Sequence, residues 1–113
     1  MIDAFRFGRI VVDGRSYGSD IKIVEGRVVS NWWRRSGHRV ERADVEDILA
    51  VSPEVLVIGK GQPGLMKVSP DLRRHLVAQG IEVIEERTPR AVETFNRLSS
   101  AGRRVAAGFH VGC

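Results

Sequence analysis

The feature that most constrains this chain is an alternation of strand-like and helix-like patterns in its second half. Apolar strand patterns at 55–58, 81–84 and 104–107 are separated by amphipathic helical patterns at 70–79 and 89–101. Parallel strands give this alternation, because each helix carries the chain back to the level at which the next strand starts. The second half is therefore predicted to form a βαβαβ unit.

Both predicted crossover helices have recognisable ends. Ser69 and Thr88 each precede a proline, and a hydroxyl N-cap followed by proline at the first helical position is typical of a helix start. Gly80 and Gly102 follow the two helices, where glycine readily adopts the left-handed conformation that ends a helix. These signals predict helices that begin at residues 70 and 89.

The first forty residues show a different pattern, in which short apolar runs are interrupted by turn sequences. Asp13-Gly14 and Glu25-Gly26 mark two tight turns, and Ser36-Gly37 marks a further chain reversal. This pattern predicts a β-meander. A short helix is then predicted with Asp44 as its N-cap, ending before Pro53.

No repeat, low-complexity tract or linker separates the two halves, and 113 residues is a common size for one domain. We therefore predict a single three-layer α/β domain that spans residues 1–113. In this fold the N-terminal β-meander packs with the βαβαβ unit in a mixed sheet. Helices are expected on one face of that sheet and the remaining meander strands on the other.

Composition and charge exclude several classes of protein. No window is long and uncharged enough to span a membrane, and the N-terminal residues lack the apolar core of a signal peptide. Cys113 is the single cysteine, so no disulfide can form within the chain. Hydrophobic residues make up 42% and charged residues 28%, as in ordinary globular proteins. These observations predict a folded cytoplasmic domain.

The net charge of +4 raises the question of nucleic-acid binding, because basic side chains that neutralise phosphates supply non-specific affinity. Residues 1–59 contain nine basic and nine acidic side chains, so the whole excess lies in residues 60–113. There it is spread over two predicted helices instead of forming one block. Nucleic acid is therefore not the expected partner.

A glycine-rich loop follows the first strand of the βαβαβ unit and has the glycine spacing of a dinucleotide-binding loop. In that motif a helix begins directly after the loop, so that its N-terminus meets the pyrophosphate. Here the helix begins only after Ser69, which favours a surface turn. The loop nevertheless leaves the carboxyl end of a parallel strand, where α/β sheets bind ligands. The candidate ligand-binding residues are Gly59, Lys60, Gly61, Gln62 and Gly64, with Thr88 and Asn96 as possible nearby polar groups.

An aromatic and basic segment ends the predicted meander. It contains Trp32, Trp33, Arg34, Arg35, His38 and Arg39. Such a segment can stack on single-stranded bases or form a protein-binding face. Adjacent side chains of a strand point to opposite faces, so we expect one tryptophan in the core and the other half covered. A structural role is favoured, and the segment is also the candidate partner-binding face.

Residues that could bind metal or perform catalysis are few. The possible nitrogen and sulfur ligands are His38, His75, His110 and Cys113, and only the last two have a metal-like spacing. Two ligands do not complete a metal site, and a terminal cysteine is poorly placed for nucleophilic catalysis. The sequence therefore predicts no metal, no cofactor and no catalytic residue.

Several short motifs together resemble a small α/β domain family of unknown biochemical function. They are Val57-Ile58-Gly59-Lys60-Gly61, Gly80-Ile81, Thr88 with Ala91 and Asn96, Gly102-Arg103-Arg104-Val105, and Phe109-His110 with Cys113. Asp20-Ile21, and Trp32 or Trp33 followed by His38, resemble the front of the family. Its animal member is associated with adipocyte differentiation, and a distant mitochondrial relative assists the assembly of respiratory complex I. The resemblance implies a compact α/β fold but no reaction.

These observations lead to two functional hypotheses. The first is a non-catalytic protein-binding or assembly module, whose partner is another protein and whose oligomeric state is open. The alternative is a small-anion or nucleotide pocket at the loop 59–64, which would also be compatible with an enzyme. The sequence contains no catalytic constellation that would favour the second.

Overall fold

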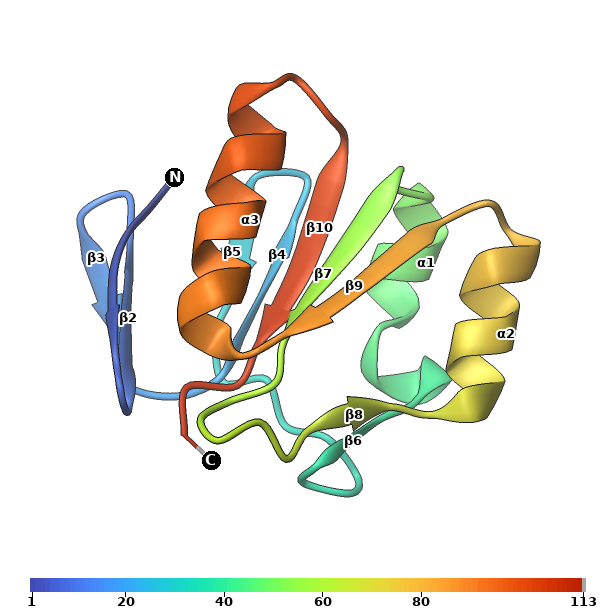
Figure 1. Ribbon diagram of the computed structural model, residues 1–113, viewed down its shortest axis with the longest axis horizontal. Coiled ribbons are helices and arrows are strands. Elements are labelled where there is room, and N and C mark those ends of the chain that lie inside the picture. Colours follow the sequence, from blue (N-terminus) through green and yellow to red (C-terminus); the bar gives the residue numbers. More distant parts are fainter. Residues whose placement is uncertain (113) are drawn as a thin grey trace.

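A computed structural model describes residues 1–112 of the chain (Figure 1). The elements follow in the order β1 Ile2–Arg6, β2 Arg9–Val12, β3 Arg15–Tyr17, β4 Ile21–Val24, β5 Arg27–Val29, β6 Arg39–Val40, the 3-10 helix η1 Arg42–Asp44, α1 Glu46–Val51, β7 Val55–Gly59, β8 Lys67–Val68, α2 Pro70–Ala78, β9 Glu82–Glu86, α3 Thr88–Ser100 and β10 Val105–Phe109. Among the described residues, no helix has the length and apolar character needed to cross a membrane.

The centre of the fold is a mixed five-stranded sheet with the order β5-β4-β10-β7-β9. Strands β10, β7 and β9 are parallel, whereas β4 and β5 join them as an antiparallel hairpin. Gly59 at the end of β7 pairs with Phe109 of β10 and Glu86 of β9, so the three parallel strands end at the same level. The predicted α/β fold, with its meander and βαβαβ unit, is confirmed.

The sheet has a hydrophobic core on each face, because alternate residues of its strands point to opposite sides. In the fully buried strand β7, Val55 and Val57 belong to one core and Leu56 and Ile58 to the other. The first core contains α3 and the second contains α1 and α2 (Figure 1). Each core also includes residues from outside the five strands, so the molecule has three layers.

The prediction that the helices lie on only one face of the sheet was therefore wrong. Strand β9 lies on one side of β7 and β10 lies on the other, so the two crossovers run in opposite directions across the sheet. Crossovers of the same handedness that run in opposite directions place their helices on opposite faces. This is why α2 and α3 are on opposite faces of the sheet.

The first three strands form a separate antiparallel sheet, β1-β2-β3, which lies beside α3 (Figure 1). Ile2, Ile10 and Val12 pack into the same core as α3. The Asn96 amide on α3 donates to the Ile2 carbonyl at 2.8 Å and its oxygen accepts from the Ile2 N–H at 3.0 Å. The sequence prediction had missed the turn at Phe7-Gly8 that divides β1 from β2.

Two of the three predicted helix caps differ from the prediction. The Ser69 hydroxyl accepts from the Leu72 N–H at 3.1 Å, which confirms the cap of α2. Thr88 is instead the first residue of α3 and makes no cap bond. Asp44 ends the 3-10 helix, where its carboxylate accepts from the Glu41 N–H at 2.8 Å, and Val45 is the N-cap of α1.

Candidate functional site

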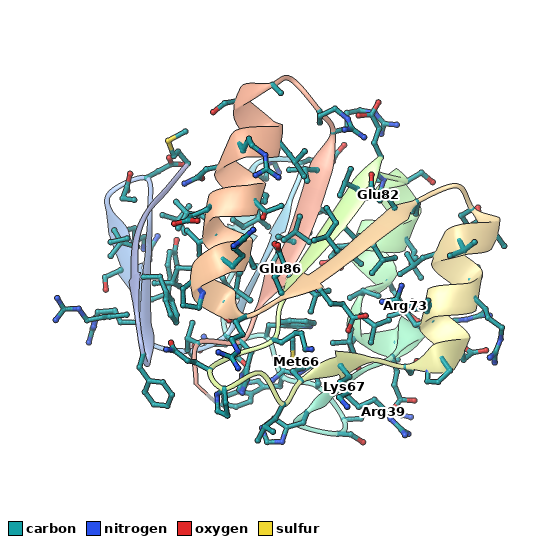
Figure 2. The ribbon with its side chains drawn as sticks, viewed as in Figure 1. Arg39, Met66, Lys67, Arg73, Glu82 and Glu86 are labelled. Carbon is teal, nitrogen blue, oxygen red and sulfur yellow. The ribbon has the colours of Figure 1, made fainter. Side chains whose placement is uncertain are left out.

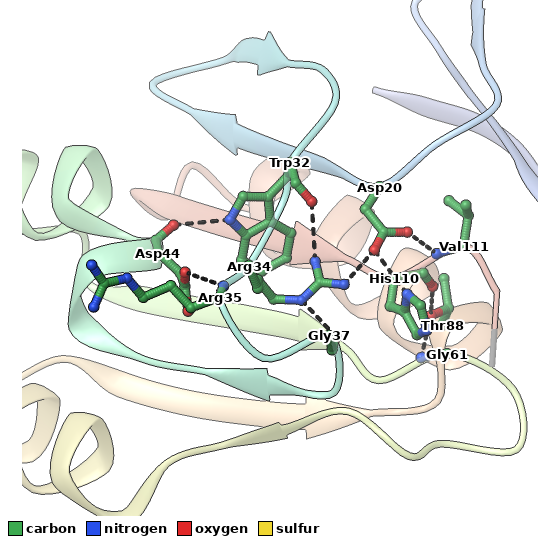
Figure 3. Close-up of polar contacts among 10 residues, drawn as sticks. All are labelled: Asp20, Trp32, Arg34, Arg35, Gly37, Asp44, Gly61, Thr88, His110 and Val111. Atoms are coloured by element: carbon green, nitrogen blue, oxygen red, sulfur yellow. Dashed lines mark hydrogen bonds and ion pairs between the residues drawn. The ribbon is translucent and has the colours of Figure 1, made fainter.

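Three loops meet at the carboxyl ends of the parallel strands (Figure 3). The segment 30–38 follows β5, the segment 60–66 follows β7, and residues 110–112 follow β10. Open α/β sheets generally place their ligands at this edge, because the loops that leave the strands are free to vary. Most of the sequence-predicted site residues lie here.

The Asp20 carboxylate joins two of these loops. One oxygen accepts hydrogen bonds from the Arg34 guanidinium at 2.6 Å and from His110 Nδ1 at 2.8 Å, and the other accepts from the Val111 N–H at 2.8 Å. The side chain of Arg34 is only 4% exposed, and that of His110 is 14% exposed. A charge-assisted contact of this kind, shielded from water, holds its partners more firmly than a surface pair.

The surroundings of Asp20 also control its protonation. Burial raises the pKa of this carboxyl, but the hydrogen bonds from His110, the Val111 N–H and Arg34 act in the other direction. Together they outweigh burial and lower the pKa of Asp20 below its ordinary value. The carboxylate is therefore ionised at neutral pH, and its negative charge balances the positive charge of the Arg34 guanidinium.

Trp32 is the buried tryptophan, with 4% of its surface exposed. Its indole N–H donates to the Asp44 carbonyl at 2.9 Å, and the Arg34 guanidinium lies 4.6 Å from the ring centroid. The ring also lies against Gly108 of β10, where a Cβ atom would be only 2.6 Å from the indole. The tryptophan fills the space that this glycine leaves above the sheet.

Trp33, the next residue, is 80% exposed. The expectation that one tryptophan enters the core is confirmed, but the other is far more than half exposed. Arg35, His38 and Arg39 are exposed as well. Of the candidate partner-binding residues, Trp32 and Arg34 are thus internal supports, and the other four are exposed. We call Trp33, Arg35, His38 and Arg39 the Trp33 surface.

The glycine loop is closed by bonds to the rest of the protein. The Gly61 N–H donates to the Thr88 hydroxyl at 2.8 Å, and that hydroxyl donates to the His110 carbonyl at 2.6 Å. The N–H groups of Lys60 and Gln62 donate to the carbonyls of Glu86 and Gly112. Three consecutive N–H groups that could have received an anion are therefore used internally.

The other candidate residues of this loop differ in exposure, and Asn96 makes its hydrogen bonds elsewhere. Gly59 is buried, and a Cβ atom there would lie 2.7 Å from Phe109 and 3.0 Å from the Thr88 hydroxyl. Gln62 is exposed and Gly64 is partly buried. Asn96 binds Ile2 of β1, so it connects α3 to the N-terminal sheet. Its polar atoms are used in that contact.

His110 has an arrangement that is common in functional histidines. Its Nδ1 is held by the Asp20 carboxylate, whereas its buried Nε2 has no hydrogen-bond partner among residues 1–112. Its ring lies edge-to-face with that of His38, with centroids 5.4 Å apart. Within the described residues no three potential ligands are grouped closely enough for a metal. Cys113, which the sequence pairs with His110 as a possible ligand, lies outside the described residues.

The role of Asp20 was not predicted from the sequence. It is separated from Arg34 by 14 positions and from His110 by 90, so no local spacing indicates their contact. The one available signal was the Asp20-Ile21 motif in the family resemblance. Strands β6 and β8, two residues each, were also missed because they are too short to show alternation.

The fold and site define a small, single-domain α/β protein whose polar cluster lies at the carboxyl ends of parallel strands. The chain belongs to the family described as "Protein of unknown function (DUF498/DUF598)", whose family model matches residues 2–110.

Solved structures agree with this assignment. The protein MT938 is 30% identical, with a TM-score of 0.82 over 100% of this chain and 98% of its own. The conserved hypothetical protein PH1505 of Pyrococcus horikoshii is 27% identical, with a TM-score of 0.86 over 100% of this chain and 99% of its own. XCC1710 of Xanthomonas campestris is 25% identical, with a TM-score of 0.82 over 99% and 84%.

Proposed function

We propose that this domain is a non-catalytic protein-binding module that contacts its partner through the Trp33 surface. The observation that carries the proposal is the contrast between two adjacent tryptophans, one 4% and the other 80% exposed. Tryptophan is enriched among the residues that dominate binding energy at protein interfaces. Burial of the exposed indole by a partner would contribute on the order of 2–4 kcal/mol.

The segment that carries Trp33 is held in one conformation before any partner arrives. On one side of it, the Trp32 N–H donates to the Asp20 carbonyl at 2.9 Å. On the other side, the Arg34 guanidinium donates to the Asp20 carboxylate at 2.6 Å and to the Gly37 carbonyl at 2.9 Å. A preorganised contact loses little conformational entropy on binding, which favours affinity.

The charge around Trp33 supports an acidic partner. Arg35 and Arg39 are exposed, and neither forms an ion pair with another described residue. Aspartate and glutamate side chains that surround an apolar residue would complement this surface. The resemblance to a complex I assembly factor and to an adipogenesis-associated protein is in keeping with a binding role, and both links stay predictions.

A library of random linear peptides displayed on phage tests the proposal. Selection on the immobilised domain is expected to enrich peptides with acidic residues beside an apolar one. Trp33→Ala should lower the affinity of the domain for the enriched peptides at least thirtyfold, which corresponds to about 2 kcal/mol of binding free energy. Val77→Ala is the matched control, because Val77 is 65% exposed on α2. Peptides that bind Trp33→Ala as tightly as the wild type would reject this surface.

The alternative, a small-anion or nucleotide pocket at the loop 59–64, has weaker support. Its N–H groups at Lys60, Gly61 and Gln62 already donate to protein oxygens. An anion at this loop would have to break those bonds. The first hypothesis is therefore the one that the geometry favours.

A further inference from the structure

A basic hollow lies at the two-stranded sheet formed by β6 and β8. It has a volume of about 350 Å³. Its lining residues are His38, Arg39, Lys67, Val68, Ser69 and Pro70. Three of them are basic and none is a carboxylate. The volume is within the range of about 300–1,000 Å³ that small-molecule sites occupy.

The two strands place Arg39 and Lys67 beside each other. These residues are register partners in the parallel β6–β8 pair, as are the following residues, Val40 and Val68. Because side chains alternate along a strand, the two valines point into the core and the two basic side chains point outward. Figure 2 shows Arg39 and Lys67 at the same edge of the molecule. Like charges on paired residues repel each other and destabilise the pair.

Two carboxylates near the strand pair are engaged with other cations. Asp71 is 3.0 Å from Arg42, and Glu85 pairs with Arg73 while accepting from the Val68 N–H at 3.0 Å. Arg39 and Lys67 form no ion pair with any residue in the described part of the chain. No carboxylate oxygen in the described part of the chain is therefore within 4.0 Å of either cation.

The other polar groups of the hollow are also donors. Ser69 is 8% exposed, and its oxygen accepts from the Leu72 N–H, which leaves the hydroxyl proton free to be donated. The His38 ring packs against His110, which Asp20 holds in turn, so its position is supported from behind. A set made of a guanidinium, an ammonium, an imidazole and a hydroxyl suits a ligand with several anionic oxygens.

We propose that this hollow binds the phosphate group of a small phosphate monoester. Arg39 contacts two phosphate oxygens through its planar fork, and Lys67 approaches a third as a point charge. Two cations balance the charge of a phosphate near neutral pH. The space beyond the phosphate, beside Val68 and Pro70, accommodates the small organic group of the ester. The hollow shares His38 and Arg39 with the Trp33 surface, but Trp33 itself does not line it, and phosphate binding goes beyond the protein-binding function proposed above.

Amide chemical shifts of the ¹⁵N-labelled full chain provide the test. Inorganic phosphate and ribose 5-phosphate are titrated separately, with sodium chloride adjusted to keep the ionic strength constant. We expect saturable shifts at residues 38–40 and 67–69, with tighter binding of the sugar phosphate. Arg39→Gln and Lys67→Gln should each weaken binding about tenfold, since each removes one charge-assisted contact.

Arg97→Gln is the matched control, because Arg97 is exposed on α3 and forms no ion pair within the described residues. It should leave the phosphate affinity unchanged. Unsaturated amide shifts at arginines over the whole surface would overturn the proposal. So would an Arg39→Gln variant that binds phosphate as tightly as the wild type. Trp33→Ala should bind phosphate like the wild type, so failure of the peptide-binding proposal and failure of this one are distinguishable.

Discussion

Replacement of Asp20 by alanine should be among the most destabilising single changes in this domain. It removes the acceptor of three hydrogen bonds, from Arg34, His110 and the Val111 N–H. It also leaves the guanidinium of Arg34, only 4% exposed, without its counter-ion. Loss of one partner from a buried ion pair costs about 3–5 kcal/mol. We expect an effect in this range on the free energy of unfolding.

Urea denaturation followed by tryptophan fluorescence measures this change, because Trp32 stacks under the Arg34 guanidinium. In thermal melts the same loss corresponds to a decrease in Tm of roughly 10–25 °C for a domain of this size. Asp13→Asn is the control, because asparagine tolerates the left-handed conformation of residue 13, which has φ 48°. Asp13 pairs with the N-terminal amine, but its side chain is 68% exposed. Its replacement should change stability by less than about 0.5 kcal/mol.

A double variant separates the cost of the unpaired buried charge from the cost of the lost hydrogen bonds. In Asp20→Ala/Arg34→Met the guanidinium is absent, so no unpaired charge is left behind. The double variant should therefore be more stable than Asp20→Ala alone, by about 1–3 kcal/mol. A cost below about 1 kcal/mol for Asp20→Ala, or strict additivity of the two substitutions, would refute the view of Asp20 as the centre of this cluster.

Two further predictions concern packing and pH. Gly108→Ala places a Cβ atom 2.6 Å from Trp32, so it should destabilise the domain by about 1–3 kcal/mol in urea melts, and the same change should cost less in a Trp32→Leu background. Since the pKa of Asp20 is lowered in the folded state, its contribution to stability is present above the unfolded value of about 3.9 and is lost as the pH falls through the lower folded value. Urea melts across this acidic range should show a steeper loss for the wild type than for Asp20→Asn, and parallel curves would contradict this assignment.

The order of the larger elements could be read from the sequence because their signals are local. Strand β7 and helices α2 and α3 follow from apolar periodicity and flanking prolines. The left-handed glycines after the two helices, Gly80 with φ 75° and Gly102 with φ 78°, were predicted from the same short-range rules. Each of these signals depends on fewer than about 15 neighbouring residues, so no knowledge of the fold is needed.

The faces and contacts depended on the tertiary structure. Whether α2 and α3 share a face follows from the strand order β10-β7-β9, which no sequence periodicity encodes. Thr88 looks like a helix cap, yet its hydroxyl connects the glycine loop to the His110 carbonyl, because the fold brings Gly61 within 2.8 Å of it. Local rules describe what a residue does for its own segment and carry no information on such partners.

The sequence by itself determined that this is a one-domain α/β chain with a meander followed by a βαβαβ unit, because backbone preferences and hydrophobic periodicity are properties of short segments. Only the tertiary structure decided which tryptophan is exposed and that Asp20 joins Arg34 to His110. It also decided that Arg39 and Lys67 lie side by side. These facts depend on the pairing of strands that are distant in sequence, and that pairing is set by packing of the whole core.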